Sequence, residues 1–202
     1  MEIVRDSSCG ELVLHTFSVI SLICTSNNSS HVIKFVNLGI IDLIKQRLTD
    51  IDTEMDHKIA TNAAFSLSNI VAEPDAIPHH AVLRSRVFQE ALIPLLQRAD
   101  ITCLLRYELT SAMGNFFIHC DFDLCYYVFS DCPILHSIVS NLIAPNTDDI
   151  TLLALLYAAN YILSVTRKFK RKAQKFKIMS AITRADEILL SFETQGGIDA
   201  LE

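Results

Sequence analysis

Three asparagines at nearly equal intervals are the residues whose side chains could act together. Asn69 ends the segment FSLSN, Asn115 ends SAMGN and Asn160 ends LYAAN, so the intervals are 46 and 45 residues. Each primary amide offers a hydrogen-bond donor and an acceptor at once. When repeated units stack, equal spacing in sequence becomes a row of side chains in space. The pattern therefore indicates a binding surface lined by amides.

The other reactive side chains do not form a recognisable catalytic or metal-binding motif. The sequence contains no serine–histidine–aspartate or cysteine–histidine arrangement, no glycine-rich phosphate loop and no paired carboxylate motif. His79 and His80 fall in a predicted loop. The six cysteines are irregularly spaced and lack the C-x-x-C pairs typical of closed zinc sites. We predict no enzymatic activity, no cofactor and no metal, and we interpret the thiols as small buried side chains in a reducing compartment.

The segments around the asparagines have the periodicity of helices. Apolar residues recur every three or four positions, which predicts helices that bury one broad face. Long helices are predicted at 11–26, 57–73, 101–120 and 148–168. Shorter helices are predicted between them at 31–39, 40–50, 88–100, 121–130 and 133–143. The more polar stretches 74–87 and 169–188 are predicted to be insertions.

The order of short, middle and long helix recurs with a period typical of armadillo and HEAT repeats, roughly 40–47 residues. We predict an all-α, right-handed armadillo-type solenoid that forms one domain over residues 1–202. Its parts are a long helix at 11–26, repeats at 31–73, 76–120 and 121–168, a partial repeat at 175–202 and a basic insertion at 167–177. The alternative is a globular helical bundle, although bundles rarely place the same polar residue on every third helix.

Composition and charge narrow the choice of partners. Half of the 202 residues are apolar and only five glycines and five prolines are present, which favours helices joined by short loops. Seven of the seventeen basic residues lie between Arg167 and Lys177, so removing them from the net charge of −6 leaves −13 for the rest of the chain. An acidic body attracts basic partners and repels nucleic acid. No uninterrupted run of eighteen apolar residues occurs, so we predict no membrane-spanning helix.

The basic run RKFKRKAQKFK at 167–177 has several interpretations. Its cations, interleaved with Phe169 and Phe176, are compatible with binding RNA, phosphoinositide headgroups or the protein's own acidic groove. The plain alternative is a solvated helix extension or loop. If the run occupies the groove, its deletion should increase the affinity for an added basic peptide.

The motifs around the asparagines resemble those of the importin-α (karyopherin-α) family, in which a long helix ends in W-x-x-x-N. The matching segments are FSLSN at 65–69, SAMGN at 111–115, ALIPLL at 91–96, LGIIDLI at 38–44 and QGGIDALE at 195–202. The resemblance covers roughly residues 11 to 202 and corresponds to the C-terminal armadillo repeats of the family.

The resemblance implies a concave groove lined by the long helices. In the family the asparagines hydrogen-bond the backbone of an extended peptide, and tryptophans four residues earlier form slots for lysine side chains. Asn69, Asn115 and Asn160 occupy the asparagine positions, and Glu108 matches an acidic residue of the binding region. The tryptophan positions hold Phe65, Ser111 and Leu156, of which only phenylalanine can bind a cation on its ring. Most of the lysine slots are therefore expected to be lost.

The function implied by the resemblance is that of an adaptor in nuclear protein import. Such a protein binds basic nuclear-localisation peptides or cargo proteins and works in the cytoplasm and nucleus. No basic segment precedes Glu11, so recruitment of importin-β by the family's usual route is not expected. One alternative is an armadillo scaffold that has lost signal-peptide binding, and another is a nucleic-acid-binding solenoid that uses the 167–177 run. We expect no membrane partner and do not favour nucleic acid.

Overall fold

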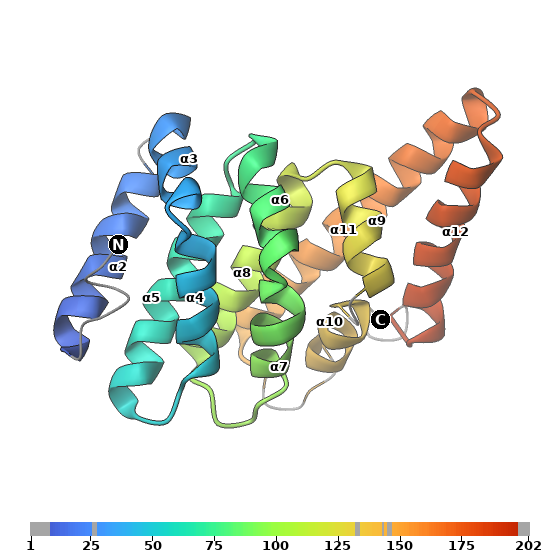
Figure 1. Ribbon diagram of the computed structural model, residues 1–202. Coiled ribbons are helices and arrows are strands. Elements are labelled where there is room, and N and C mark those ends of the chain that lie inside the picture. Colours follow the sequence, from blue (N-terminus) through green and yellow to red (C-terminus); the bar gives the residue numbers. More distant parts are fainter. Residues whose placement is uncertain (1–8, 26–27, 132–133, 143, 145–146, 198–202) are drawn as a thin grey trace.

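The computed structural model describes residues 9–25, 28–131, 134–142, 144 and 147–197, and these residues form helices joined by short connections without any strand (Figure 1). The helices are α2 (Gly10–Cys24), α3 (Ser29–Asn37), α4 (Ile40–Thr49), α5 (Glu54–Val71), α6 (Ala76–Ser85), the π-helical turn η1 (Phe88–Leu92), α7 (Ile93–Leu96), α8 (Cys103–His119), α9 (Phe122–Asp131), α10 (Ile134–Leu142), α11 (Asp149–Lys175) and α12 (Met179–Thr194).

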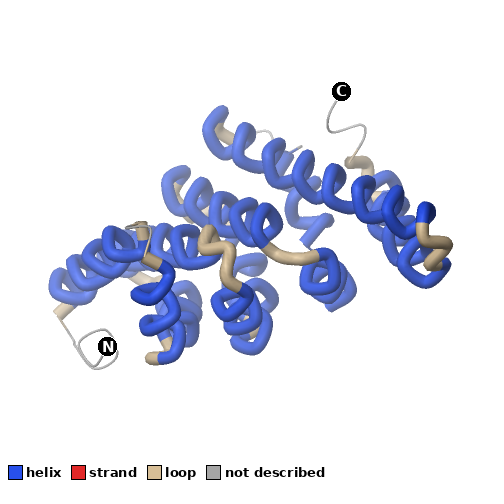
Figure 2. Tube along the Cα trace, turned by 90° about the horizontal axis from the view of Figure 1, so that it is seen from above, coloured by secondary structure: helices blue, strands red, loops and turns tan. Residues whose placement is uncertain are grey.

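The helices form a solenoid of two rows. The long helices α2, α5, α8 and α11 follow one another in chain order, and each packs against the next (Figures 1 and 2). The shorter helices make the second row, in front of the long ones in Figure 1. Each complete repeat consists of a short, a middle and a long helix, as in α3–α4–α5. This arrangement brings the long helices, with the predicted asparagines, side by side.

Side-chain caps fix where three of the long helices begin. At α5 the Thr53 hydroxyl accepts the Asp56 N–H at 3.2 Å, and the Asp56 carboxylate accepts the Thr53 N–H at 2.9 Å. Thr102 and Asp148 accept backbone N–H groups in the same way at the starts of α8 and α11. Each cap satisfies a backbone donor that has no partner within its helix. The caps therefore fix the residue at which each of these helices begins.

Two stretches predicted as insertions belong instead to regular helices. Residues 76–85 form α6, the short helix of the second repeat, and the Asp75 carboxylate caps it by accepting the Ile77 N–H at 2.8 Å. His79 and His80 therefore lie in a helix and not in a loop. The segment 169–188 contains the last turns of α11, a tight turn and the first part of α12.

The basic run 167–177 is likewise a helical extension of α11 and not an insertion. Phe169 stacks on Phe122 of α9 with ring centroids 3.5 Å apart, and Ala173 is buried. Lys170 forms an ion pair with Asp186 of α12. These contacts hold the inner side of the extension against α9 and α12, which explains why the helix continues through a charged sequence.

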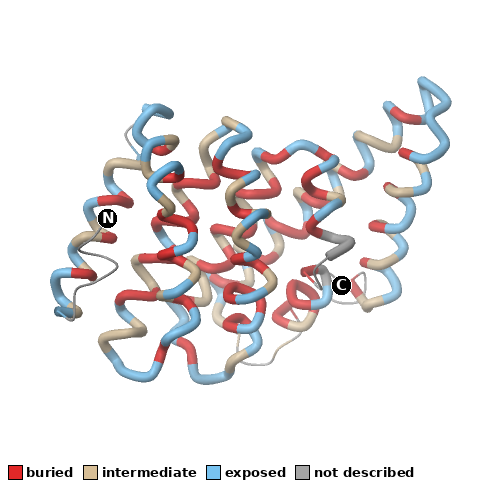
Figure 3. The backbone as a smooth tube through the Cα atoms, viewed as in Figure 1, coloured by how far each residue is buried: buried red, intermediate tan, exposed pale blue. Residues whose placement is uncertain are grey.

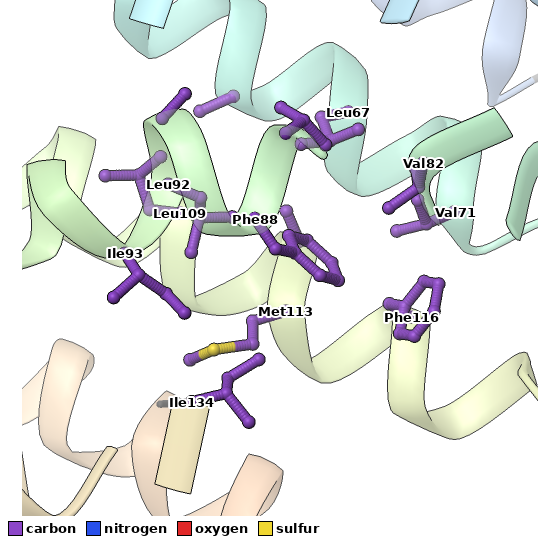
Figure 4. Packing of buried hydrophobic residues seen from close by; sticks show 14 of the residues in the cluster. Leu67, Val71, Val82, Phe88, Leu92, Ile93, Leu109, Met113, Phe116 and Ile134 are labelled. Atoms are coloured by element: carbon purple, nitrogen blue, oxygen red, sulfur yellow. The ribbon is translucent and has the colours of Figure 1, made fainter. Parts of the chain in front are cut away.

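One apolar core runs through the repeats (Figure 3). At its centre Phe116 of α8 meets Phe88 edge to face with centroids 5.0 Å apart, and Met113 and Leu67 are fully buried beside them (Figure 4). Burying a side chain of this size contributes about 2–3 kcal/mol relative to leaving it exposed. The core thereby fixes each long helix relative to its neighbours.

Helix α11 is long and apolar enough to cross a membrane by length and composition alone, with a mean hydropathy of 1.4 in its most apolar window. In the solenoid, however, Leu155, Ala158 and Ile162 are buried, and the helix packs against α8 and α12. Its place in the core therefore explains part of its apolar character, since 39% of that window is buried.

Candidate functional site

A hollow of about 440 Å³ lies where the exposed sides of α5, α8 and α11 meet. Four of the predicted site residues line it: Phe65, Glu108, Ser111 and Asn115. The rest of its wall is largely apolar or aromatic and includes Tyr107, Ile118, Ile150, Leu153 and Tyr157. We call this feature the central hollow. It brings these predicted residues of α5 and α8 next to side chains of α11.

Two of the three asparagines bridge adjacent long helices. Asn115 donates from Nδ2 to the Ser68 hydroxyl at 3.0 Å, and the same nitrogen lies 3.3 Å from the Ser68 carbonyl oxygen. Asn69 donates in the same way to the Ser21 hydroxyl at 2.8 Å. Both side chains are half-buried. Each amide nitrogen therefore has two acceptors within reach, the hydroxyl and the backbone carbonyl of one serine, whereas its carbonyl oxygen accepts no hydrogen bond from the described residues.

Asn160 differs from the other two asparagines. It is exposed and makes no hydrogen bond within the described part of the chain. Asn115 bridges to Ser68, the residue directly before Asn69 on the preceding long helix. The corresponding residue for Asn160 is Gly114, directly before Asn115, and glycine has no hydroxyl to accept a hydrogen bond. Neither Asn160 nor Asn69 lines the central hollow, so Asn115 is the one predicted asparagine in its lining.

Glu108 is the one carboxylate that lines the central hollow. It is half-buried, and no hydrogen bond or ion pair reaches it from the described residues. Burial without a compensating partner disfavours the charged form and raises the pKa of Glu108 to about 7. A cation placed in the hollow would pair with this carboxylate and lower the pKa again.

Aromatic rings line the hollow from positions that the resemblance did not indicate. Leu156, at a tryptophan position, is half-buried and packs against the core. Its neighbour Tyr157 is 64% exposed and faces the hollow, as does Tyr107, one turn before Ser111. The rings of Phe65, Tyr107 and Tyr157 therefore supply much of the aromatic surface that the loss of tryptophans was expected to remove. The signal in the sequence was the four-residue spacing of Tyr107 and Ser111, which places them on one helix face.

The other reactive groups are separate from the hollow. No cluster of three or more histidine, cysteine or acidic side chains suited to a metal ion occurs in the described ranges. Cys120 and Cys125 are buried, Cys24 is half-buried, and Cys9 and Cys103 are exposed. The prediction of buried thiols therefore holds for two of these five, and Cys132 lies outside the described residues. His79 is buried, its Nε2 lies 3.0 Å from the Val71 carbonyl oxygen, and burial lowers its pKa.

Comparisons with known proteins identify the fold. No family model and no curated protein matches the chain. Among solved structures, a designed armadillo repeat protein superposes with a TM-score of 0.69 at 15% identity, over 99% of this chain and 89% of that one. An engineered protein matches with a TM-score of 0.68 at 17% identity, over 99% and 86%. A computationally designed armadillo repeat protein for modular peptide recognition superposes with a TM-score of 0.66 at 16% identity, over 94% of this chain and 79% of that one.

This chain has an armadillo-type fold. The predicted all-α armadillo-type solenoid is thereby confirmed, and the alternative of a globular bundle is wrong. At these identities the likeness concerns the fold, so membership of the importin-α family stays a prediction.

Proposed function

We propose that this armadillo-type chain binds an extended peptide across the central hollow. The observation that carries the proposal is the convergence of Asn115, Glu108 and three aromatic rings from α5, α8 and α11 on one hollow of about 440 Å³. Asn115 would hold the peptide backbone through its carbonyl oxygen, which would accept a backbone N–H of the peptide. The designed neighbour made for modular peptide recognition supports a peptide as the kind of partner.

The lining of the hollow favours a basic side chain in the peptide. Rings of phenylalanine and tyrosine attract a lysine or arginine cation over their faces, and their apolar surface accommodates its methylene stem. Glu108 lacks a partner within the described residues and would supply the opposite charge. We therefore propose a basic peptide of the nuclear-localisation type, bound by an adaptor of nuclear import that works in the cytoplasm and nucleus.

A second candidate is an armadillo scaffold that holds an apolar partner segment. The observation in its favour is the exposure of Ile150 and Leu153 at the edge of the same hollow. These side chains would contact apolar side chains of a ligand and would give no preference for a positive charge. The two candidates therefore differ in whether ligand charge matters.

Fluorescence anisotropy with a labelled lysine-rich peptide tests the proposal. Asn115→Ala should weaken binding about tenfold, equivalent to about 1.4 kcal/mol. The matched control is Asn62→Ala, because Asn62 also bridges to the preceding long helix, donating to the Ser18 hydroxyl at 3.0 Å, but does not line the central hollow. Equal affinities for the two variants, or no binding by the folded wild type, would contradict peptide binding at this site.

A second titration separates the basic-peptide proposal from the scaffold. The labelled peptide is compared with a copy in which norleucine replaces each lysine, and both are titrated with wild type and with Glu108→Gln. A preference for lysine that Glu108→Gln abolishes supports the basic peptide. Equal binding of both peptides by wild type supports the apolar scaffold.

A further inference from the structure

The end of α11 and the start of α12 form a projecting tip. Residues 167–179, which we call the basic tip, include the last turns of α11 and the turn into α12. In Figure 1 the two helices extend together beyond the rest of the solenoid, and Figure 3 shows this end as largely exposed. The tip is separate from the central hollow, which α11 lines near its other end.

Five cations of the tip lie on one exposed side of α11. Arg167, Arg171 and Lys175 follow one another at intervals of four residues, and Lys168 and Lys172 stand beside them. Residues four apart lie on the same face of a helix, so these side chains form a stripe about two turns long. All five are exposed, and none forms a hydrogen bond or ion pair within the described residues. The inner side of the helix is different, since Lys170 there pairs with Asp186.

The turn that follows the stripe presents large apolar side chains to solvent. Phe176 is 62% exposed, Ile178 49% and Met179 69%. The turn is held by hydrogen bonds from the Ile178 N–H to the Ala173 carbonyl at 3.0 Å and from the Lys177 N–H to the Gln174 carbonyl at 3.1 Å. Three adjacent large apolar side chains at an extremity, flanked by unpaired cations, are unfavourable in water unless a partner covers them.

We propose that the basic tip docks on an anionic lipid bilayer. Phe176, Ile178 and Met179 enter the boundary between headgroups and acyl chains, while the cation stripe lies against the negatively charged headgroups. The sequence from 150 to 185 contains no acidic residue, and the acidic remainder of the chain is repelled by the same surface. The charge distribution therefore orients the molecule with its tip toward the bilayer.

The apolar turn favours a bilayer over a nucleic acid. A single-stranded nucleic acid would use the cations and stack its bases on aromatic rings. Only one of the three exposed apolar side chains, Phe176, is aromatic, and Ile178 and Met179 gain little from base stacking. A bilayer buries all three. The inference does not depend on peptide binding in the central hollow.

Vesicle flotation with the full chain tests the proposal. Vesicles of phosphatidylcholine and phosphatidylserine should bind the protein, and vesicles of phosphatidylcholine alone should not. Replacing Arg171, Lys172 and Lys175 by glutamine should weaken binding about 100-fold, because each cation near an anionic surface strengthens binding about fivefold. Phe176→Ser/Met179→Ser should weaken it about tenfold through lost apolar burial.

Matched control variants change the same residue types elsewhere on the surface. Lys34→Gln/Lys58→Gln/Arg84→Gln removes three exposed cations, and Leu22→Ser/Leu38→Ser removes two exposed apolar side chains. Both should bind vesicles as the wild type does, and circular dichroism should show that every variant is folded. Equal binding by tip and control variants would overturn the proposal.

The absence of tryptophan from the sequence allows a direct test of insertion. Phe176→Trp introduces a single tryptophan at the tip, and its emission should shift to shorter wavelength when anionic vesicles are added. Binding without a shift would overturn insertion of the turn. Binding of single-stranded RNA that the glutamine variant loses and the serine variant keeps, with no binding to vesicles, would overturn the proposal in favour of a nucleic-acid surface.

Discussion

An asparagine that bridges two long helices can still serve a ligand. Asn115 donates one amide hydrogen to Ser68, which fixes the rotamer of its side chain. A fixed side chain loses little conformational entropy when it binds a peptide, so the bridge prepares the carbonyl oxygen of Asn115 for that role. Asn160 lacks such a bridge and is exposed, so its side chain would lose more freedom on binding.

Glu108 should make the stability of the fold depend on pH. Its pKa is raised from 4.5 to about 7 by burial, so between these values the unfolded chain releases a proton that the folded chain keeps. Stability therefore falls as pH rises through this window. Because the side chain is only half-buried, solvent screening limits the effect to about 1 kcal/mol. Urea unfolding at pH 5 and pH 7.5 measures it.

The comparison with Glu108→Gln isolates this residue. Burial lowers the pKa values of His79 and His119, whose titration gives the opposite slope but occurs in both proteins. The free energy of unfolding of wild type relative to Glu108→Gln should therefore fall between pH 5 and pH 7.5. An unchanged difference would mean that the carboxylate is well solvated.

At the residue scale, the sequence predicted residues that recur at the same position of each repeat, and it missed residues that stand outside this register. Glu108, Ser111 and Asn115 follow the register of the repeat, and they line one hollow. Tyr157 was missed because it stands one position away from that register. Ser68 could not be predicted as the partner of Asn115, because the contact depends on how two long helices are rotated against each other.

At the scale of helices, periodicity predicted the long elements best. Helix α6 was missed because Pro78 and two histidines interrupt the apolar pattern of AIPHHAVLRS. The extension of α11 was missed because its sequence is mostly charged. Phe169, which is half-buried there, and Ala173, which is buried, pack against other helices that the local sequence does not indicate. In both segments tertiary contacts, and not local helix propensity, determine that the chain is helical.

Gly114 and Gly39 should respond in opposite ways to alanine. Gly114 lies inside α8, and a Cβ there would meet only the Ala158 Cβ, at 3.9 Å. Gly114→Ala should stabilise the fold by about 1 kcal/mol, because glycine disfavours a helix interior. Gly39 has φ +81°, so Gly39→Ala should destabilise by about 1 kcal/mol although the space is open. Thermal and urea unfolding measure both, and stabilisation by Gly39→Ala would contradict the argument.

The turn after α11 carries backbone strain at Lys177. Its φ of 55° is left-handed, and it occupies the position after the helix that Gly196 occupies after α12. Lys177→Gly should stabilise the fold by about 1 kcal/mol, because glycine has no Cβ to clash in this conformation. Lys177→Ala removes the same charge but keeps the Cβ and should give no such gain in chemical unfolding. A gain from both variants would point to relief of charge repulsion instead.

At the scale of the whole molecule, the two ends differ in chemistry. The N-terminal end presents a largely apolar hollow of about 620 Å³ between α2 and α3, lined by Val19, Leu22 and Leu38 among others. The other end presents the basic tip. The sequence predicted the stacking of repeats and the separation of charge, but not which helices would project, because that follows from the pairing of α11 with α12.

Stacking should also give the solenoid a gradient of local stability. Among the described helices, α5 and α8 each pack against a long helix on both sides, whereas α2 packs against one long helix, α5, and α12 packs mainly on α11. In a solenoid, stability is a sum of repeat and nearest-neighbour contributions, so the helices with one neighbour open first. Hydrogen exchange should show opening free energies roughly 2 kcal/mol lower in α2 and α12 than in α5 and α8.

Truncation of a central side chain distinguishes this gradient from a single cooperative unit. Phe116 is fully buried and contacts the rings of His79, Phe88 and Phe117. Phe116→Ala should cost about 3–5 kcal/mol and should reduce protection in α5 and α8. Exchange in α2 and α12 should change little, because those helices already open locally below the global barrier. Equal loss of protection in all four helices would mean that the described repeats unfold only as one unit.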